Sequence, residues 1–453
     1  MNPTERFHFI GIGGAGMSAI AKVLLERGHT VTGSDLKRSR VASVLEAMGA
    51  TVHVGHDPDY VEDASTVVVS SAISKRNPEY LRAVELDLHV ITRGTALAEV
   101  LKGTRSVVVA GTHGKTTTTS MIVTILRTAG LDPTYLVGAG LNDSGTNARA
   151  GSGDVAVAEA DESDGSFLLL NPHISVITNL EMDHIDHWGD MDSLTQAFSD
   201  FAGLTEQGGC LVVPSADPRL VEMARATGRR VITFGSGGDL DAHDVGSVGF
   251  GASFSLTAAD GDVGVELRVP GAHNIANALA AAGAAVALDV PLDDIARGLA
   301  SYRGVERRFH VRGERGGVTV VDDYAHHPTE ISATLAAAQT GPWKRVVAIF
   351  QPHRFTRTLA LAEEFGEAFE AADRVIFMDV YGAGEEAIPG VTGKLLADSV
   401  CRRFPGRPVA FFPHRDDMLK FTRSVIKPGD LLLTMGAGDV TSVGEQLLGS
   451  GST

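Results

Sequence analysis

Residues 107–119 constrain the fold more than any other stretch, because they join a buried strand to a helix through a glycine-rich loop. Residues 107–110 form an apolar, β-branched run typical of a buried strand, and residues 120–127 have the composition of a helix. Backbone N–H groups in such a loop, together with the helix dipole, favour a phosphate chain. The residues predicted to bind it are Gly111, Thr112, His113, Gly114, Lys115, Thr116 and Thr117.

Lys115 and Thr116 carry the chemistry expected of this loop. A lysine at this position reaches the terminal phosphates, and the hydroxyl of the following threonine faces Mg²⁺. The general phosphate-loop pattern has a glycine where this chain has Val109, so the loop is a shorter Gly-x-x-Gly-Lys-Thr. The alternative is an ordinary strand-to-helix turn. The lysine and threonine favour phosphate binding, with Mg²⁺ as the predicted metal.

Composition bounds the class of protein. A chain of 453 residues predicts two to four domains, and 43% hydrophobic with 21% charged residues is a soluble globular composition. The net charge of −17 disfavours nucleic acid as a partner. Two distant cysteines fit a reducing cytosol, and the absence of an eighteen-residue apolar run predicts no membrane span. We therefore expect a cytoplasmic protein, and we interpret residues 7–21 as a strand and turn, not a signal peptide.

A second glycine pattern lies near the start of the chain. A strand at residues 7–10 is followed by Gly-x-Gly-x-x-Gly, a helix at 17–27 and a strand at 30–33; an acid comes nineteen residues after the last glycine. This spacing alone predicts NAD, but any nucleoside diphosphate satisfies it, including a UDP-sugar. A tight turn without a ligand is the alternative. The predicted ligand-binding residues are Gly11, Gly13, Gly14, Ala15, Gly16, Ser34 and Asp35, with Ser70 and Ser71 at the end of a further strand.

The middle of the chain places acids and imidazoles after two more strands. Glu159 lies near the end of the strand predicted at residues 154–160, and a carboxylate there is the expected Mg²⁺ ligand. His184 follows the strand at 174–178 and could bind a second metal or act as a base; a structural or surface histidine is the alternative. Asn274, before an alanine-rich helix, begins that helix or presents its amide to a base edge. Residues 235–264 read as turns joining short strands.

The last segment predicts another parallel α/β unit. Its strands end in polar loops, and open α/β sheets bind ligands at strand carboxyl ends. Arg354 and Arg357, three residues apart, suit a carboxylate or a phosphate. Surface-loop chemistry is the alternative, and four such loops from one sheet make a binding site the better interpretation.

Taken together, these motifs resemble the Mur ligase family of peptidoglycan synthesis. The resemblance rests on both glycine loops, Glu159-Ala160-Asp161-Glu162-Ser163, Asp183-His184, His273-Asn274, Arg307-Arg308-Phe309, residues 322–328 and Gln351-Pro352-His353-Arg354, in family order. The short phosphate loop is the form found in this family. The resemblance implies an ATP-dependent, ADP-forming amide ligase that uses UDP-N-acetylmuramate and L-alanine, so that the first glycine loop binds a UDP-sugar and not NAD.

The resemblance also implies individual roles. Lys115 would hold the β- and γ-phosphates, Thr116 and Glu159 the first Mg²⁺, and His184 would lie near a second. Asn274 would meet adenine, Arg308 the phosphates and Asp323 the ribose, while His326, Arg354 and Arg357 would face the muramoyl and alanine groups. Sister ligases carry a carbamoylated lysine after the His184 motif. Here no lysine occurs between Lys115 and Lys344, which leaves acids such as Asp186, Asp190 and Asp192 as candidate ligands.

The sequence therefore predicts three α/β domains, each built on a largely parallel sheet. They are a Rossmann-like UDP-sugar domain at 1–103, a central phosphate-loop ATPase-type domain at 104–312 and a Rossmann-like C-terminal domain at 313–453. The alternatives are a murein-tripeptide recycling ligase, expected to differ at residues 351–357, and an ATP-regulated binding protein. The oligomeric state, monomer or dimer, stays open.

Overall fold

The computed structural model describes residues 5–70 and 72–449. Most strands lie in three larger sheets, and three further strands form a small sheet. The chain divides into two compact units; one carries the first two larger sheets and the other carries the last. Within the described part of the chain, no helix combines the length and hydrophobicity needed to cross a membrane. The predicted α/β class with largely parallel sheets is confirmed.

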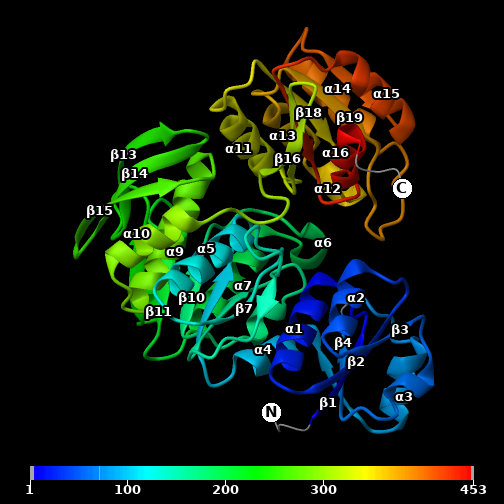
Figure 1. The fold of residues 1–453 in the computed structure, drawn as a ribbon, viewed down its shortest axis with the longest axis vertical. Helices are drawn as coiled ribbons and strands as arrows, with labels where there is room; N and C mark the ends of the chain where they lie inside the picture. Colours follow the sequence, from blue (N-terminus) through cyan, green and yellow to red (C-terminus); the bar gives the residue numbers. More distant parts are fainter. Residues whose placement is uncertain (1–4, 71, 450–453) are drawn as a thin grey trace. The chain divides into compact units, whose positions relative to one another are not determined.

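The first sheet has five parallel strands in the order β3-β2-β1-β4-β5 (Figure 1). Because the order reverses at β1, the loops after β1 and β4 lie at the switch point where such sheets bind ligands. Met17 of α1 and Leu97 of α4 pack on one face, and Ala83 of α3 packs on the other. The bounds are β1 Arg6–Ile10, α1 Ala15–Glu26, β2 Thr30–Asp35, α2 Arg40–Ala47, β3 Thr51–Val54, the 3-10 helix η1 Pro58–Val61, β4 Thr66–Val69, α3 Pro78–Glu85, β5 His89–Thr92 and α4 Arg93–Leu101.

The second sheet has the order β12-β11-β10-β6-β9-β7-β8, with only the β7–β8 pair antiparallel among the described pairings. The strands β10, β6 and β9 are neighbours. His184 follows β10, Lys115 begins the helix after β6, and Glu159 is the last residue of β9, so parallel pairing brings the three residues to one edge of the sheet. The bounds are β6 Arg105–Ala110, α5 Lys115–Thr128, β7 Thr134–Leu136, β8 Ala148–Arg149, β9 Val155–Glu159, η2 Ser166–Leu169, β10 Ile174–Ile177, α6 Ile185–Trp188, α7 Met191–Gly203, β11 Cys210–Pro214, α8 Pro218–Ala226, β12 Arg230–Phe234, α9 Ala272–Ala287 and α10 Leu292–Ser301.

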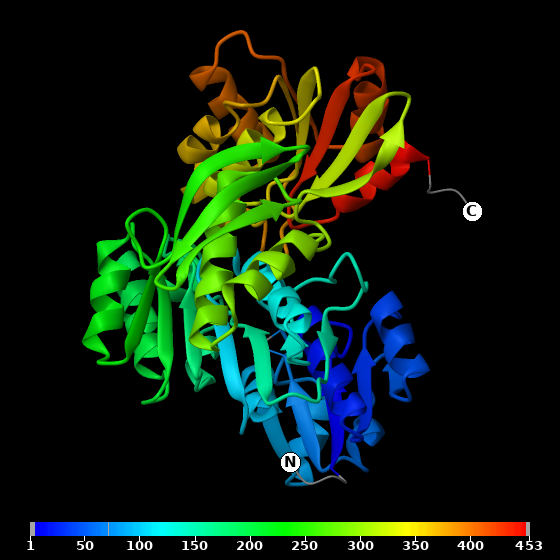
Figure 2. The same cartoon turned by 60° about the vertical axis from the view of Figure 1, so that its left-hand side comes forward.

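The glycine-rich region between β12 and α9 contains strands joined by turns, as predicted, but the strands are longer than expected. They are β13 (Asp241–Val248), β14 (Gly251–Ala258) and β15 (Gly261–Leu267), which lie side by side as a three-stranded sheet (Figure 2). In β14 the apolar side chains of Ala252, Phe254 and Leu256 are buried at every second position. This alternation is the strand signal that the glycines and aspartates masked.

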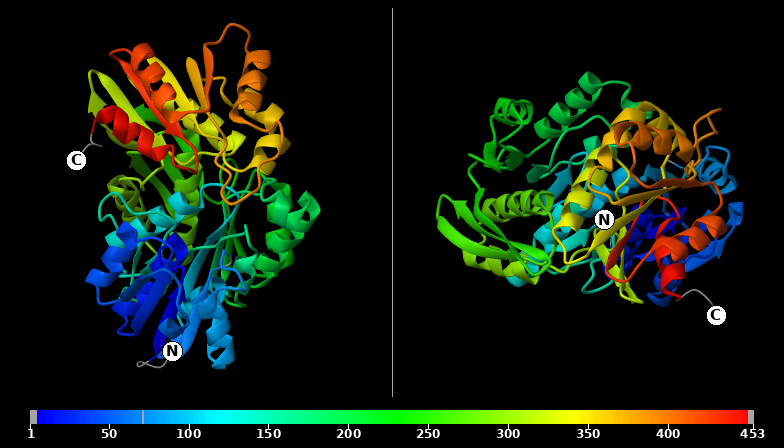
Figure 3. Two further views of the ribbon diagram at one scale, coloured as in Figure 1. Left: turned by 90° about the vertical axis from the view of Figure 1, so that its right-hand side faces the viewer. Right: turned by 90° about the horizontal axis from the view of Figure 1, so that it is seen from above.

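The last sheet has the order β16-β17-β21-β18-β19-β20, parallel except for β16. Helices cover both of its faces (Figure 3). Leu335 of α11 and Leu396 of α14 belong to the hydrophobic cluster on one face, and Met418 of α15 and Val443 of α16 to the cluster on the other. The bounds are β16 His310–Arg315, β17 Val318–Asp323, α11 Pro328–Gln339, β18 Arg345–Phe350, α12 Phe355–Ala360, α13 Ala362–Ala368, β19 Arg374–Met378, α14 Gly393–Arg403, β20 Val409–Phe412, α15 Arg415–Val425, β21 Asp430–Met435 and α16 Thr441–Leu448.

Candidate active site

The phosphate loop after β6 needs both of its glycines. Gly111 (φ +131°) and Gly114 (φ +82°) have backbone angles that L side chains rarely adopt. A Cβ at Gly111 would collide with Thr178 Oγ1, and one at Gly114 with Asn277 Oδ1. Gly114 is the N-cap of α5, which has no side-chain cap. The first N–H groups of α5, at Lys115 and the residues after it, can therefore bind an anion, as the sequence predicts.

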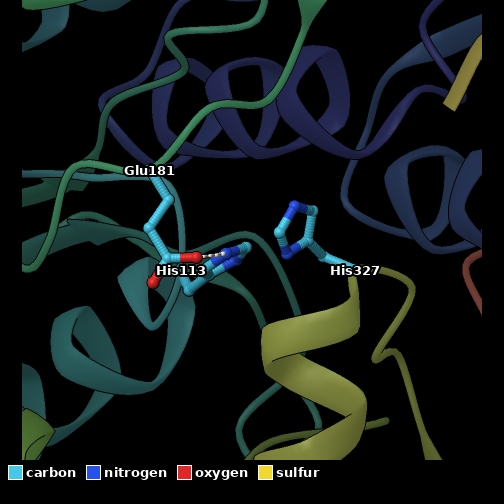
Figure 4. Close-up of side chains that lie close together, drawn as sticks. All are labelled: His113, Glu181 and His327. Carbon is cyan, nitrogen blue, oxygen red and sulfur yellow. Dashed lines mark ion pairs between the residues drawn. The ribbon is translucent and has the colours of Figure 1, made fainter. Parts of the chain in front are cut away.

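The loop after β10 holds the phosphate loop from one side. Asn179 Oδ1 accepts from the His113 N–H at 2.9 Å, and Asn179 Nδ2 donates to the His113 carbonyl at 2.9 Å. Thr112 Oγ1 donates to the Glu181 carbonyl at 3.0 Å, and His113 Nε2 lies 3.4 Å from Glu181 Oε2 (Figure 4). Sequence analysis missed Asn179 and Glu181. Their signal is that they follow the strand paired directly with β6.

Lys115 is bound to its own loop and to a buried acid. Its Nζ donates to the Gly111 carbonyl at 2.5 Å, the Thr112 carbonyl at 3.2 Å and Glu162 Oε1 at 2.8 Å. Burial acts to lower the pKa of Lys115, but the carboxylates of Glu162 and Glu159 outweigh it and raise the pKa, so the side chain stays an ammonium. Burial raises the pKa of Glu162 to about 7, although Lys115 acts in the opposite direction. Glu162 is a third residue to which the sequence assigned no individual role.

The predicted magnesium ligands Thr116 and Glu159 lie together. Thr116 Oγ1 donates to both carboxylate oxygens of Glu159, at 3.0 and 2.9 Å. His184 has its Nε2 3.7 Å from Glu162 Oε1 and 3.7 Å from Asp183 Oδ2. Glu162 Oε2 is buried without a hydrogen-bond partner. The Thr116 hydroxyl, the Glu159 carboxylate and the unpaired Glu162 Oε2 are oxygen donors, and such donors fit Mg²⁺. Thr117, also predicted at the phosphates, is buried in the first turn of α5.

The first glycine loop is held by the end of β2. The Ser34 carbonyl accepts from the N–H groups of Gly11 at 2.9 Å and Ile12 at 3.0 Å, and Asp35 Oδ2 accepts from the Gly13 N–H at 2.9 Å. These three donors are occupied within the protein. The anion-binding element that remains is the N-terminus of α1, where the N-cap Gly14 forms no side-chain cap before Ala15. Of the two predicted serines after β4, Ser70 Oγ accepts from the Ala72 N–H at 3.3 Å, and Ser71 lies outside the described residues.

A buried polar network lies beneath the residues that hold this loop. Glu79, in the first turn of α3, is fully buried. Its Oε2 accepts from Ser34 Oγ at 2.7 Å and lies 2.8 Å from His8 Nε2, and its Oε1 lies 2.8 Å from His56 Nδ1. Burial acts to raise the pKa of Glu79, but the hydrogen bonds from His8, Ser34 and His56 outweigh it and lower the pKa. Sequence analysis missed all of this network except Ser34.

In the C-terminal unit, Asp323 and Arg308 organise the loop after β17. Asp323 Oδ2 accepts from the Phe309 N–H at 2.7 Å, and its Oδ1 accepts from the Ala325 N–H at 2.7 Å. Burial raises the pKa of Asp323 to about 6, although Arg308 acts in the opposite direction. The Arg308 guanidinium lies 5.2 Å from the centre of the Tyr324 ring. Asp323 therefore shapes the loop through its own backbone contacts, and its predicted contact with a ribose stays a prediction.

Two more predicted side chains, His326 and Arg357, lie near one histidine in the loops after β17 and β18. The rings of His326 and His353 lie 5.8 Å apart, edge to face, and Arg357 Nη1 lies 3.4 Å from His353 Nδ1. Arg354 has a φ of +69° and lies 3.8 Å from Glu385 Oε1. Glu385, another residue that sequence analysis missed, accepts from the backbone N–H groups that begin α12. His326 and Arg357 are thus brought near one imidazole at the carboxyl edge of the sheet.

Asn274 and His273 begin α9. Asn274 is buried, and its Nδ2 donates to the Pro270 carbonyl at 2.7 Å. Burial, assisted by Arg308, lowers the pKa of His273 to about 4, so this imidazole is neutral at physiological pH. His327, next to the predicted His326, is the N-cap of α11 (Figure 4). Asn274 therefore has a helix-start role, and its predicted contact with adenine stays a prediction.

Comparison with known proteins places this geometry in one family. Three family models match consecutive parts of the chain: the Mur ligase family catalytic domain at residues 6–105, the Mur ligase middle domain at 109–285 and the Mur ligase glutamate ligase domain at 307–438.

Relatives cover almost the whole chain. The chain is 48% identical to the UDP-N-acetylmuramate–L-alanine ligase of Rubrobacter xylanophilus, over 98% of this chain and 99% of that protein. It is 45% identical to the ligase of the same name from Geotalea daltonii, over 98% and 97%. The crystal structure of the UDP-N-acetylmuramate–alanine ligase of Thermotoga maritima superposes with a TM-score of 0.82 at 28% identity, over 98% of both chains. Sequence, fold and phosphate-loop geometry agree, and the chain belongs to the Mur ligase family.

Proposed function

We propose that this protein is an ATP-dependent ligase that joins L-alanine to the carboxylate of UDP-N-acetylmuramate, releasing ADP and phosphate in the cytoplasm. The observation that carries the proposal is the grouping of Lys115, Thr116, Glu159 and Glu162 on adjacent strand ends, in a chain that also has a second glycine loop. The residues around Lys115 fit a nucleoside triphosphate, and the other glycine loop fits a nucleoside diphosphate sugar.

The reaction proceeds through an acyl phosphate. The muramoyl carboxylate attacks the γ-phosphoryl group, ADP leaves, and the L-alanine amine then attacks the activated carbonyl to release phosphate. The Lys115 ammonium, which now donates to its own loop carbonyls, turns to the β- and γ-phosphates when they arrive. Positioning and charge neutralisation supply most of the rate enhancement in phosphoryl transfer.

The acids around the loop fit a metal-assisted version of this step. Thr116 and Glu159 would hold one Mg²⁺, and His184 with a neighbouring carboxylate would hold a second. Bound Mg²⁺ neutralises charge that develops on the phosphate oxygens. In the C-terminal domain His326, Arg354 and Arg357 receive the muramoyl and alanine groups, because two guanidinium groups suit carboxylates.

A coupled ADP-release assay tests the proposal. ADP release should require UDP-N-acetylmuramate and L-alanine together, and omission of either should reduce the rate to background. Turnover that persists without both acceptors would refute the ligase function and favour an ATP-regulated binding protein. Preference for the murein tripeptide over L-alanine would assign the chain to the recycling reaction.

A further inference from the structure

Arg93, the first residue of α4, extends its guanidinium to the acidic loop that follows β9. Nη2 donates to Asp161 Oδ2, Asp164 Oδ2 and Ser166 Oγ, each at 3.2 Å. All three contacts use one nitrogen of the side chain. A guanidinium has five N–H donors, so most of the fork is left for another acceptor.

The other side of the same guanidinium lies against the first turn of α1. A Cβ built at Gly16 would stand 3.1 Å from Arg93 Cδ and 3.2 Å from Arg93 Nη1, closer than ordinary side-chain contacts. Gly16 does not have the positive φ of Gly111 or Gly114. The glycine at this position is therefore explained by the arginine that passes over it and not by backbone conformation.

The placement of Arg93 is fixed by its surroundings. A Cβ at Gly94 would stand 2.8 Å from Ser166 Cβ and 2.9 Å from Leu169 Cδ1, so α4 lies directly against η2. Leu97 of α4 and Phe167 of η2 belong to the same hydrophobic cluster. The arginine side chain is 20% exposed. A cation held in this way loses little conformational freedom when it binds a ligand.

We propose that Arg93 binds the diphosphate of the UDP-sugar through Nη1 and Nε, while Nη2 stays on the acidic loop. This inference rests on the proposed function for the identity of the ligand. The N-terminus of α1 offers N–H groups, but Asp35 places a carboxylate in the same loop, 2.9 Å from the Gly13 nitrogen. An arginine offsets that charge and presents a planar fork that suits phosphate oxygens. Arg93 is thereby a substrate-binding residue that also touches the loop carrying the ATP-site acids.

Kinetics of Arg93→Ala test the proposal. Loss of a charged hydrogen-bond donor to phosphate should raise the KM for UDP-N-acetylmuramate on the order of 10- to 100-fold, with the KM for ATP within about twofold of wild type. Arg93→Lys keeps the charge and loses the fork, so an increase of about tenfold is expected. Arg82→Ala is the matched control, because Arg82 lies in the same domain and pairs with the exposed Glu62 and Glu85.

Direct binding separates a phosphate contact from a purely structural role. By calorimetry, Arg93→Ala should weaken the binding of UDP more than that of UMP, because the diphosphate is the proposed partner and UMP lacks one of its phosphates, and Asp164→Asn should change UDP affinity less than Arg93→Ala does. Equal losses for UDP and UMP, an unchanged KM for the UDP-sugar, or an equal rise in the KM for ATP would overturn the proposal. If Arg93→Ala does not fold, Arg93→Lys carries the same tests. Absence of UDP-sugar-dependent ADP release by the wild type would instead overturn the proposed function.

Discussion

The two glycine loops of this protein share a strand, a glycine turn and an uncapped helix, but their surroundings differ. The loop before α5 contains its own cation, Lys115, and faces acids from the neighbouring strand β9. The loop before α1 contains no lysine, and its N–H groups at Gly11 and Gly13 are already bound by Ser34 and Asp35. A glycine pattern therefore predicts an anion site, whereas the residues on neighbouring strands determine which anion we expect the site to bind.

The largest expected effect concerns the cation inside the second loop. Lys115→Ala should reduce kcat by on the order of 10²-fold or more, because no other described side chain donates to the same loop carbonyls and acid together. UDP-sugar binding, measured by calorimetry, should stay near wild type, because the first loop is separate. Lys102→Ala, at the exposed end of α4, is the control. Near-normal kcat in a folded Lys115→Ala variant would remove the proposed distinction between the loops.

The buried network under the first loop should matter mainly for stability. Glu79→Ala leaves His8, Ser34 and His56 without their shared acceptor, so the free energy of unfolding should fall by about 3 kcal/mol. Denaturant unfolding measures this loss. Glu85→Gln, an exposed acid on the same helix, should change stability by no more than about 0.5 kcal/mol. Equal effects of the two variants would contradict a buried role for Glu79.

The lowered pKa of Glu79 also sets the direction of a pH effect. Because the pKa of Glu79 in the folded state lies below its ordinary value of 4.5, the carboxylate contributes stability above pH 4.5, and the contribution is lost as pH falls through the folded-state pKa. Glu79→Gln should therefore flatten the acid side of the stability curve. If the loss of stability at acidic pH is unchanged in this variant, other carboxylates cause that loss.

The strand, glycine turn and helix of the second loop could be predicted because their signal is local. The two glycines at 111 and 114, Lys115 and Thr116 lie within six residues, and the strand β6 that leads to them ends in the apolar run of residues 107–110. Sequence analysis failed where the partner is distant in sequence. Glu79 binds Ser34 across 45 positions, and Glu385 binds the Phe355 N–H across 30. Such pairs depend on which strands become neighbours, and a single sequence does not encode that order in any local pattern.

A smaller effect is expected from the acid of the first loop. Asp35→Ala removes the acceptor that fixes the Gly13 N–H in the turn. We expect the loss of this ordered turn to outweigh the removal of a negative charge near the diphosphate, so the KM for the UDP-sugar should rise about tenfold and the KM for ATP should not change. Asp63→Ala, an exposed acid of the same domain, is the control. NAD and NADP should not bind the wild type in calorimetry. Binding of either would revive the dehydrogenase interpretation that the glycine spacing alone suggests.

The last prediction is that bicarbonate does not change turnover. It concerns the second metal proposed near the second glycine loop. Sister ligases use a carbamoylated lysine there, whose formation consumes CO₂, but residues 116–343 of this chain contain no lysine. Asp190 and Asp186 are two of the acids predicted from the sequence as ligands of the second metal. The Asp190 carboxylate accepts from the Ser193 N–H and caps α7. The Asp186 side chain lies outside the described residues.

Glu162 and Asp183 each lie 3.7 Å from His184 Nε2, and Glu162 Oε2 has no hydrogen-bond partner. These carboxylates can supply a hard oxygen ligand without modification. Turnover in CO₂-depleted buffer should therefore not change when bicarbonate is added back. A sister ligase that uses a carbamoylated lysine is the positive control. Its activity should fall in CO₂-depleted buffer and recover when bicarbonate is added. A bicarbonate-dependent recovery in this protein would show that its second metal is not held by carboxylates alone.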